Sequence, residues 1–95
     1  MDIKYRITDE EMIIQLPKRV ESEDALRFEK EMYCIIKDGM GYKTFFDAEN
    51  LEYISESALV VLLKLRLEFG DLKMINYNSE LHKFLKENGY SELVQ

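Results

Sequence analysis

The sequence predicts a single α/β domain in which helices pack on a mostly parallel sheet that begins with an antiparallel hairpin. Apolar segments with the period of a strand alternate along the chain with segments that have the period of a helix. The links between these segments are short, which favours one layered unit. The chain has 95 residues, enough for one hydrophobic core but not for two. One domain is therefore expected over residues 1–95.

The N-terminal segment predicts the hairpin. Ile3–Ile7 alternates apolar and polar side chains, and Met12–Leu16 forms a second apolar run after the polar turn Thr8–Glu10. Pro17 has no backbone donor and should end the second strand.

The first helix is expected to begin at Ser22 as N-cap and to end near Lys37, with Gly39 beyond it. Cys34 on this helix should be a small buried apolar residue. The predicted apolar face repeats at helical spacing: Ala25, Phe28, Met32 and Ile35 or Ile36.

The short apolar run Thr44–Phe46 predicts a central strand covered on both faces. After the loop 47–50, residues 51–54 lead into a second helix, which should begin at Ser55 and run to about Phe69 before Gly70. Its core-facing stripe is expected to be Ala58, Leu62, Leu65 and Phe69.

The C-terminal third predicts a strand, a helix and a last short edge strand. The strand covers Leu72–Tyr77, Asn78 or Ser79 caps the helix, and Gly89 ends it. Tyr90–Val94 then forms the edge strand. The inward residues of this helix are expected to be Leu81, Phe84 and Leu85.

Composition excludes several function classes. A net charge of −6 argues against nucleic acid and against an anionic membrane surface as partner. No apolar run is long enough to insert into a membrane, and the N-terminus lacks the pattern of a secretory signal. The single cysteine favours a reducing cytoplasm. One Cys and one His cannot supply a typical zinc site, and phosphate-cradling glycine motifs are absent, so neither metal nor cofactor is expected.

No set of nucleophile, base and oxyanion donors can be assembled, so we expect no catalytic residues. Cys34 has only His82 as a prospective base, and His82 is expected to face solvent. Asp47 follows a central strand and has two interpretations: the phosphoacceptor of a receiver domain, or a turn-forming or capping residue.

The most informative junction is the start of the second helix, Ser55-Glu56-Ser57-Ala58. A helix start carries unpaired N–H groups and a partial positive charge, so it favours an anionic group. Val60, Leu63 and Leu67 line up below Glu56, which indicates either a contact surface or a more widely buried helix. The carboxylates of Glu21, Glu23 and Asp24 either compensate the positive end of the first helix dipole or contact a partner.

The chain resembles the STAS family, the anti-sigma factor antagonist domain of bacteria, from about Ile3 to Val94. The strongest part is Leu51–Leu59, which is similar to the family's strand-exit motif. Residues 61–64, 71–76 and 84–90 resemble the helix, the next strand and the F-x-x-x-G helix end that follow it. Arg19–Ser22 resembles the family's approach to the first helix.

This resemblance implies a STAS-like fold and a non-enzymatic binding switch. In the family, a Ser at the second helix start is phosphorylated by a partner that is both kinase and anti-sigma factor, and phosphorylation abolishes binding. Glu56 occupies that phosphoacceptor position here, and Ala58 stands where the family has Gly. Glu56 is then a fixed negative charge, which either mimics a permanent phosphate or meets a partner that has adapted to a carboxylate. Alternatively, Ser55 or Ser57 has become the phosphoacceptor. A further interpretation is that these two serines only cap the helix.

The partner surface is expected to comprise Glu21, Ser22, Ser55, Glu56, Ser57 and Val60. The expected partner is an anti-sigma factor or a kinase-like protein, and the aligned apolar residues of the second helix also suit a homodimer. A second hypothesis is a cytoplasmic STAS subunit of a lipid or anion transporter complex, for which the loss of the phosphoacceptor Ser is no obstacle.

Overall fold

An antiparallel hairpin opens the chain, as predicted, in the computed structural model, which describes all 95 residues. Strand β1 (Lys4–Ile7) pairs with β2 (Glu11–Gln15) across the polar turn. Along β2 every second side chain is fully buried, namely those of Met12 and Ile14. This is the alternation of a strand that has one face on the core.

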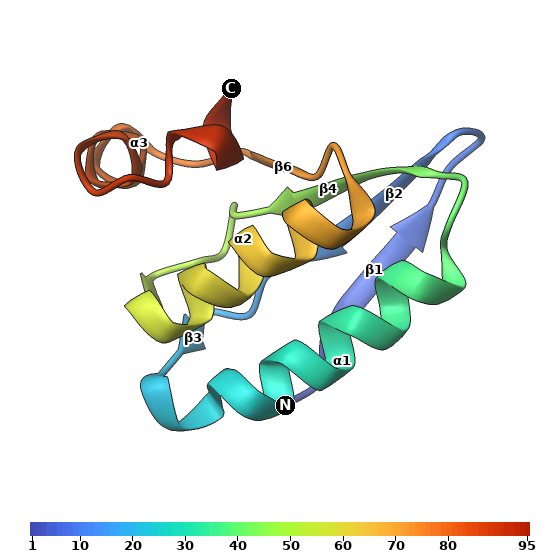
Figure 1. The fold of residues 1–95 in the computed structure, drawn as a ribbon, viewed down its shortest axis with the longest axis horizontal. Helices are drawn as coiled ribbons and strands as arrows, with labels where there is room; N and C mark the ends of the chain where they lie inside the picture. The colour runs from blue at the N-terminus through green and yellow to red at the C-terminus, as the bar shows by residue number, and fades with distance from the viewer.

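Two further strands complete a four-stranded sheet in the order β1-β2-β4-β6 (Figure 1). Strand β4 (Lys43–Asp47) lies parallel to β2, and β6 (Lys73–Ile75) lies parallel to β4. Helix α1 (Ala25–Asp38) connects β2 to β4, and α2 (Glu56–Phe69) connects β4 to β6. The mostly parallel sheet with an antiparallel start is the predicted fold class.

A second, two-stranded sheet was not predicted. Strand β3 (Arg19–Val20) pairs in parallel with β5 (Tyr53–Ile54). Two residues are too short to show a period in the sequence. This sheet matters for the site, because β3 leads into the 3₁₀ turn η1 (Ser22–Asp24) before α1, and β5 leads into α2. The pairing therefore holds the starts of the two helices near each other.

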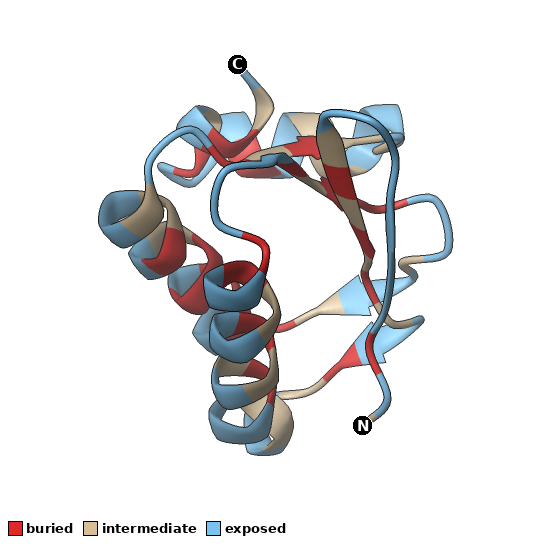
Figure 2. Cartoon of the chain, turned by 90° about the vertical axis from the view of Figure 1, so that its right-hand side faces the viewer, coloured by how far each residue is buried: buried red, intermediate tan, exposed pale blue.

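Helices α1 and α2 cover one face of the main sheet, and the hydrophobic core lies between the two layers (Figure 2). From the sheet, Met12, Ile14, Phe46 and Met74 point into it. From α1 it receives Phe28, Met32 and Ile36, and from α2 Ala58, Leu59, Val61, Leu62 and Leu65. The predicted stripe of α2 is confirmed, with Phe69 packed at the margin of the core.

The opposite face of the sheet is not covered by a helix (Figure 2). Phe46 is fully buried, whereas its neighbour Phe45 is half-buried, because adjacent side chains of a strand point to opposite faces. The prediction that this strand is covered on both faces is therefore wrong. Ile13 and Ile75 share the uncovered face with Phe45, since these strands pair in register.

The α1 segment differs from expectation in two details. The helical segment begins with η1, whose N-cap position is Glu21 rather than Ser22. Cys34 is exposed, so the prediction of a buried cysteine is wrong. The buried face repeats every four residues through Met32 and Ile36, and Cys34, two residues after Met32, points away from it.

The C-terminal segment contains helix α3 (Ser79–Glu87) and the 3₁₀ turn η2 (Ser91–Val94), so the predicted edge strand over 90–94 is wrong. Gly89 adopts a φ of 86°, and the amide of Tyr90 donates to the carbonyl of Leu85 at 2.8 Å, which turns the chain back. Leu85 is buried as predicted, but Phe84 is 37% exposed because it lies at the border of the apolar face.

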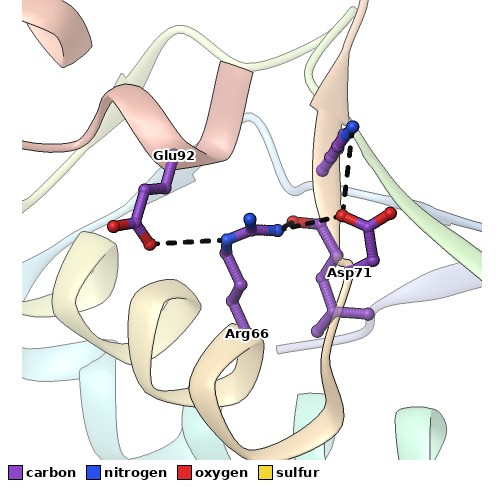
Figure 3. A network of polar contacts seen from close by, with 5 residues as sticks. Arg66, Asp71 and Glu92 are labelled. Carbon is purple, nitrogen blue, oxygen red and sulfur yellow. Dashed lines mark hydrogen bonds and ion pairs between the residues drawn. The ribbon is translucent and has the colours of Figure 1, made fainter. Parts of the chain in front are cut away.

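Arg66 of α2 connects this C-terminal segment to the rest of the molecule (Figure 3). Its guanidinium lies 3.6 Å from a carboxylate oxygen of Glu92 in η2 and 3.3 Å from one of Asp71. It also donates a hydrogen bond of 3.2 Å to the carbonyl of Leu72. Turn η2 packs on β6, so the C-terminal segment extends the helical layer at that edge of the sheet. No helix of the structure combines the length and the apolar character needed to cross a membrane.

Candidate functional site

The start of α2 is fixed by Ser55, which uses all of its polar groups. Its hydroxyl accepts a hydrogen bond of 3.2 Å from the amide of Ala58, the N-cap interaction that a helix start requires. Its own amide donates to the carbonyl of Val20 in β3 at 2.9 Å, and its carbonyl accepts from Leu59 at 3.0 Å. Ser55 is only 2% exposed. Ser55 therefore holds the start of α2 from the protein interior, and its hydroxyl is not presented at the surface.

Glu56 and Ser57 follow in the first turn of α2 and are both exposed. The carboxylate of Glu56 lies where the partial positive charge of the helix start stabilises an anion. The helix cap is made by Ser55, so Ser57 is free of that role. Of the two serines considered as phosphoacceptors, Ser57 is the accessible one.

A groove of about 480 Å³ lies between the start of α1 and the first half of α2. It brings together three of the predicted site residues, Ser22, Ser57 and Val60, although Ser22 is far from the other two in sequence. We call it the α2 groove. Its lining residues are Ser22, Glu23, Ala25, Leu26, Glu29, Ser57, Val60, Val61 and Lys64.

The α2 groove has an apolar side and a charged end. Val60 is 47% exposed and Leu26 is 67% exposed, so two aliphatic side chains from different helices line the same groove at the surface. At one end, Nζ of Lys64 lies 2.8 Å from a carboxylate oxygen of Glu29 and connects the two helices. Leu26 was missed by the sequence analysis, yet its apolar side chain lies outside the predicted face of α1, and that signal was available.

The apolar residues aligned with Glu56 on α2 were expected to form either a contact surface or part of a more widely buried helix, and they divide between the two. Val60 and Leu67 are exposed, whereas Leu63 packs against the core. The exposed pair therefore favours a contact surface on α2, and Leu63 belongs to the wider burial of the helix.

Glu21, the remaining predicted site residue, lies outside the α2 groove. Its carboxylate accepts a hydrogen bond of 3.0 Å from Nε of Arg19, whose guanidinium lies 4.9 Å from the centroid of the Tyr53 ring. Its backbone amide donates to Oδ2 of Asp24 at 3.2 Å. This bond, reinforced by the bond of 2.9 Å from Arg27 to Oδ1, lowers the pKa of the Asp24 carboxyl below its ordinary value.

Asp47 lies at the carboxyl end of β4 and is buried. Its Oδ1 accepts hydrogen bonds from the amide of Glu49 at 2.9 Å and from Nδ2 of Asn76 at 3.1 Å. This is the geometry of a turn-forming Asp, so that interpretation is confirmed. His82 is half-buried and stacks on Tyr77 with ring centroids 5.4 Å apart, rather than facing solvent fully.

Another hollow, of about 600 Å³, lies at the ends of β2 and β4. It is lined mainly by polar residues of both charge signs, and Lys18 in it already pairs with Glu52 at 3.3 Å. It therefore lacks the convergent polar groups on an apolar wall that mark a ligand site. Nowhere do three His, Cys, Asp or Glu side chains gather in a way that could hold a metal ion.

No protein-family model matches the sequence, and a search of curated proteins finds no match. Solved structures do match. The anti-sigma factor antagonist SpoIIAA in its unphosphorylated form aligns with a TM-score of 0.68 at 16% identity, over 90% of this chain and 82% of that chain. The NMR structure of the protein TM1081 aligns with a TM-score of 0.79 at 20% identity, over 96% of this chain and 76% of that chain.

The murine anion transporter Slc26a9, solved in the inward-facing state, aligns with a TM-score of 0.59 at 15% identity. The match covers 82% of this chain but 14% of the transporter, so it concerns one small part of that protein. These likenesses show that the chain has a STAS-like, SpoIIAA-like fold, which confirms the fold that the sequence resemblance implies.

Replacing Ser55 by Ala should lower the free energy of unfolding by about 1 kcal/mol, because the amide of Ala58 loses its cap. Urea denaturation of the variant beside the wild type measures this. Ser57→Ala, two residues further along the chain, is the matched control, and it should change stability by less than about 0.5 kcal/mol. Equal effects of the two substitutions would contradict the assignment of the cap to Ser55.

Replacing Asp24 by Asn should reduce stability in a pH-dependent way. The pKa of Asp24 is lowered in the folded state, so its charged form stabilises the fold. That contribution is present above the unfolded pKa of about 4 and is lost as the pH falls through the folded pKa. The gap in unfolding free energy between wild type and variant should therefore shrink below about pH 4. A constant gap from neutral to acidic pH would contradict this.

Proposed function

We propose that this chain is a non-enzymatic protein-binding module of bacterial transcription regulation, acting in the cytoplasm on an anti-sigma factor or a kinase-like protein. The observation that carries the proposal is the exposed Glu56 at the start of α2, beside the α2 groove, on a fold shared with an anti-sigma factor antagonist. Glu56 stands where the STAS resemblance places the phosphoacceptor Ser.

The charge at this position defines the switch. A phosphoserine would bring about −1.5 to −2 charges to the helix start, whereas a glutamate brings one that no phosphatase can remove. Glu23 lines the neighbouring groove and adds to the negative potential, whereas Glu29 in the same lining is paired with Lys64. A partner must therefore either present cations to this surface or be repelled by it.

The α2 groove supplies the remaining parts of a recognition surface. Val60 and Leu26 offer exposed apolar area, and Ser22 and Ser57 offer hydroxyl groups next to it. An apolar centre with a polar rim is the usual organisation of a protein–protein interface. Glu21 lies outside the groove, where its pairing with Arg19 makes it a rim contact.

Ser57 is the residue through which phosphorylation would still act. Its hydroxyl is accessible in the first turn of α2, whereas that of Ser55 is buried and engaged as the helix cap. A phosphate on Ser57 would add about 1.5 to 2 negative charges to the single charge of Glu56 and oppose an acidic partner surface.

A second candidate function is that of a partner subunit in a lipid or anion transporter complex. The likeness of this fold to a small part of the Slc26a9 anion transporter supports it. The loss of the phosphoacceptor Ser supports it as well, since such a subunit need not be a kinase substrate.

The proposal predicts that Glu56→Ser changes partner capture from an extract of the native cells. If Glu56 mimics phosphate, the variant should retain an anti-sigma or kinase-like protein more strongly than the wild type, because the repelling charge is gone. If the partner has adapted to the carboxylate, only the wild type should retain it. Captured proteins are identified by mass spectrometry, and Val60→Asp should weaken capture in either case.

Glu68→Ser is the matched control, since Glu68 is exposed near the other end of the same helix. It should leave capture unchanged. Equal capture of an anti-sigma protein by wild type, Glu56→Ser and Val60→Asp would contradict the assignment of this surface. Capture of transporter components instead would favour the second candidate function.

A homodimer would use the same apolar residues, so it is tested at Val60. Light scattering should then report a wild-type dimer at micromolar concentrations and a monomer for Val60→Asp, because an aspartate would be buried at the interface. Monomers in both samples would contradict self-association through the α2 groove.

A further inference from the structure

Strand β1 is the free edge of the main sheet. It pairs with β2 on one side only, and all four of its residues are exposed. The other edge strand, β6, is packed against η2. An uncovered edge presents unpaired backbone donors and acceptors, to which another strand can add.

The register shows which backbone groups are unpaired. The amide of Thr8 donates to the carbonyl of Glu11 at 2.8 Å across the hairpin, so that pair is hydrogen-bonded. Bonded and non-bonded pairs alternate in an antiparallel ladder, which makes Arg6 and Lys4 bonded to β2 as well. The amides and carbonyls of Tyr5 and Ile7 therefore point away from the sheet.

The far side of β2 supports this assignment independently. The amide of Leu16 donates to the carbonyl of Asp47 at 2.9 Å, and the carbonyl of Glu10 accepts from Lys43 at 3.0 Å. The even-numbered residues of β2 thus bond to β4, which leaves Ile13 and Gln15 to bond to β1, opposite Arg6 and Lys4.

The side chains of β1 divide sharply between the two faces. Tyr5 and Ile7 are opposite the core residues Ile14 and Met12, yet they are 51% and 47% exposed because α1 does not cover this edge. Lys4 and Arg6 point to the uncovered sheet face.

That uncovered face is basic in a chain of net charge −6. Besides Lys4 and Arg6 it carries Lys43, whose ammonium lies 5.6 Å from the centroid of the Phe45 ring, and Lys73. Glu11 is the carboxylate that shares this face near β1. Opposite charges directly across a ladder stabilise a strand pair, and like charges destabilise it.

We propose that β1 binds an extended segment of a partner protein as a fifth strand, and that in this segment apolar residues alternate with acidic ones. The apolar residues contact Tyr5 and Ile7, and the acidic residues pair with Lys4 and Arg6. Antiparallel pairing of β1 with β1 of a second copy, centred on Tyr5 or Arg6, would set Arg6 against Lys4 or against Arg6, and this repulsion disfavours self-pairing. The proposal is independent of the function assigned to α2.

The experiment is amide hydrogen exchange by NMR on the full chain. The probe is an acetylated, amidated peptide of three valines alternating with three glutamates. Without peptide, the amides of Tyr5 and Ile7 should exchange fast and that of Arg6 slowly. Roughly millimolar peptide should slow exchange at Tyr5 and Ile7, because both amides gain an acceptor. A peptide with the valines and glutamates in two separate blocks should bind at least about tenfold more weakly.

Two variants test the two parts of the recognition. Ile7→Pro removes one outward donor that the β1–β2 ladder does not use, and Arg6→Glu reverses one charge. Each should weaken peptide binding roughly tenfold. Lys83→Glu on α3 is the matched charge control and should bind like the wild type.

Three results would overturn the proposal. The first is the absence of slowed exchange at Tyr5 and Ile7, or slowing confined to other residues. The second is equal binding of the alternating and block peptides. The third is slowed exchange at Tyr5 and Ile7 in the protein alone as its concentration rises, which would show that a second copy occupies the edge.

Discussion

The buried hydroxyl and backbone of Ser55 are the constraint on which the candidate site depends. One residue caps α2, continues the hydrogen bonding of β5 to β3 and accepts the first bond of the helix. Because these bonds fix where α2 begins, Glu56 and Ser57 are held outside the core. The same pairing of β3 with β5 sets the start of α1 beside that of α2, which forms the α2 groove. A change in this junction would therefore move every residue of the site together.

The parts of the structure that follow from local patterns could be predicted from the sequence. The alternation in Ile3–Ile7, the helical stripe ending at Phe69 and the cap-like Ser55 each express a short-range rule. The same pattern predicted that the second helix starts at Ser55-Glu56, and α2 begins at Glu56.

The predictions that were wrong or missing concern parts of the structure that depend on tertiary packing. Residues 90–94 have the composition of a strand, yet they form η2, because Gly89 turns the chain and Leu93 finds its place in the core. Strands β3 and β5 are too short for a periodic pattern to be recognised in the sequence. The α2 groove joins Ser22 to Ser57, and no local pattern links residues that far apart. Leu26 was detectable only as an apolar residue outside its helix face.

The two edges of the main sheet have different surroundings. Turn η2 packs on β6, whereas all four residues of β1 are exposed, so β1 is the edge that a further strand can reach more easily. A segment bound at β1 would therefore add at the end of the sheet that lies away from the C-terminal segment. Arg66, through its contact with Glu92, links α2 to the segment that packs on β6. The C-terminal segment thus makes the two edges of one sheet unequal, and only β1 keeps an exposed strand for a partner.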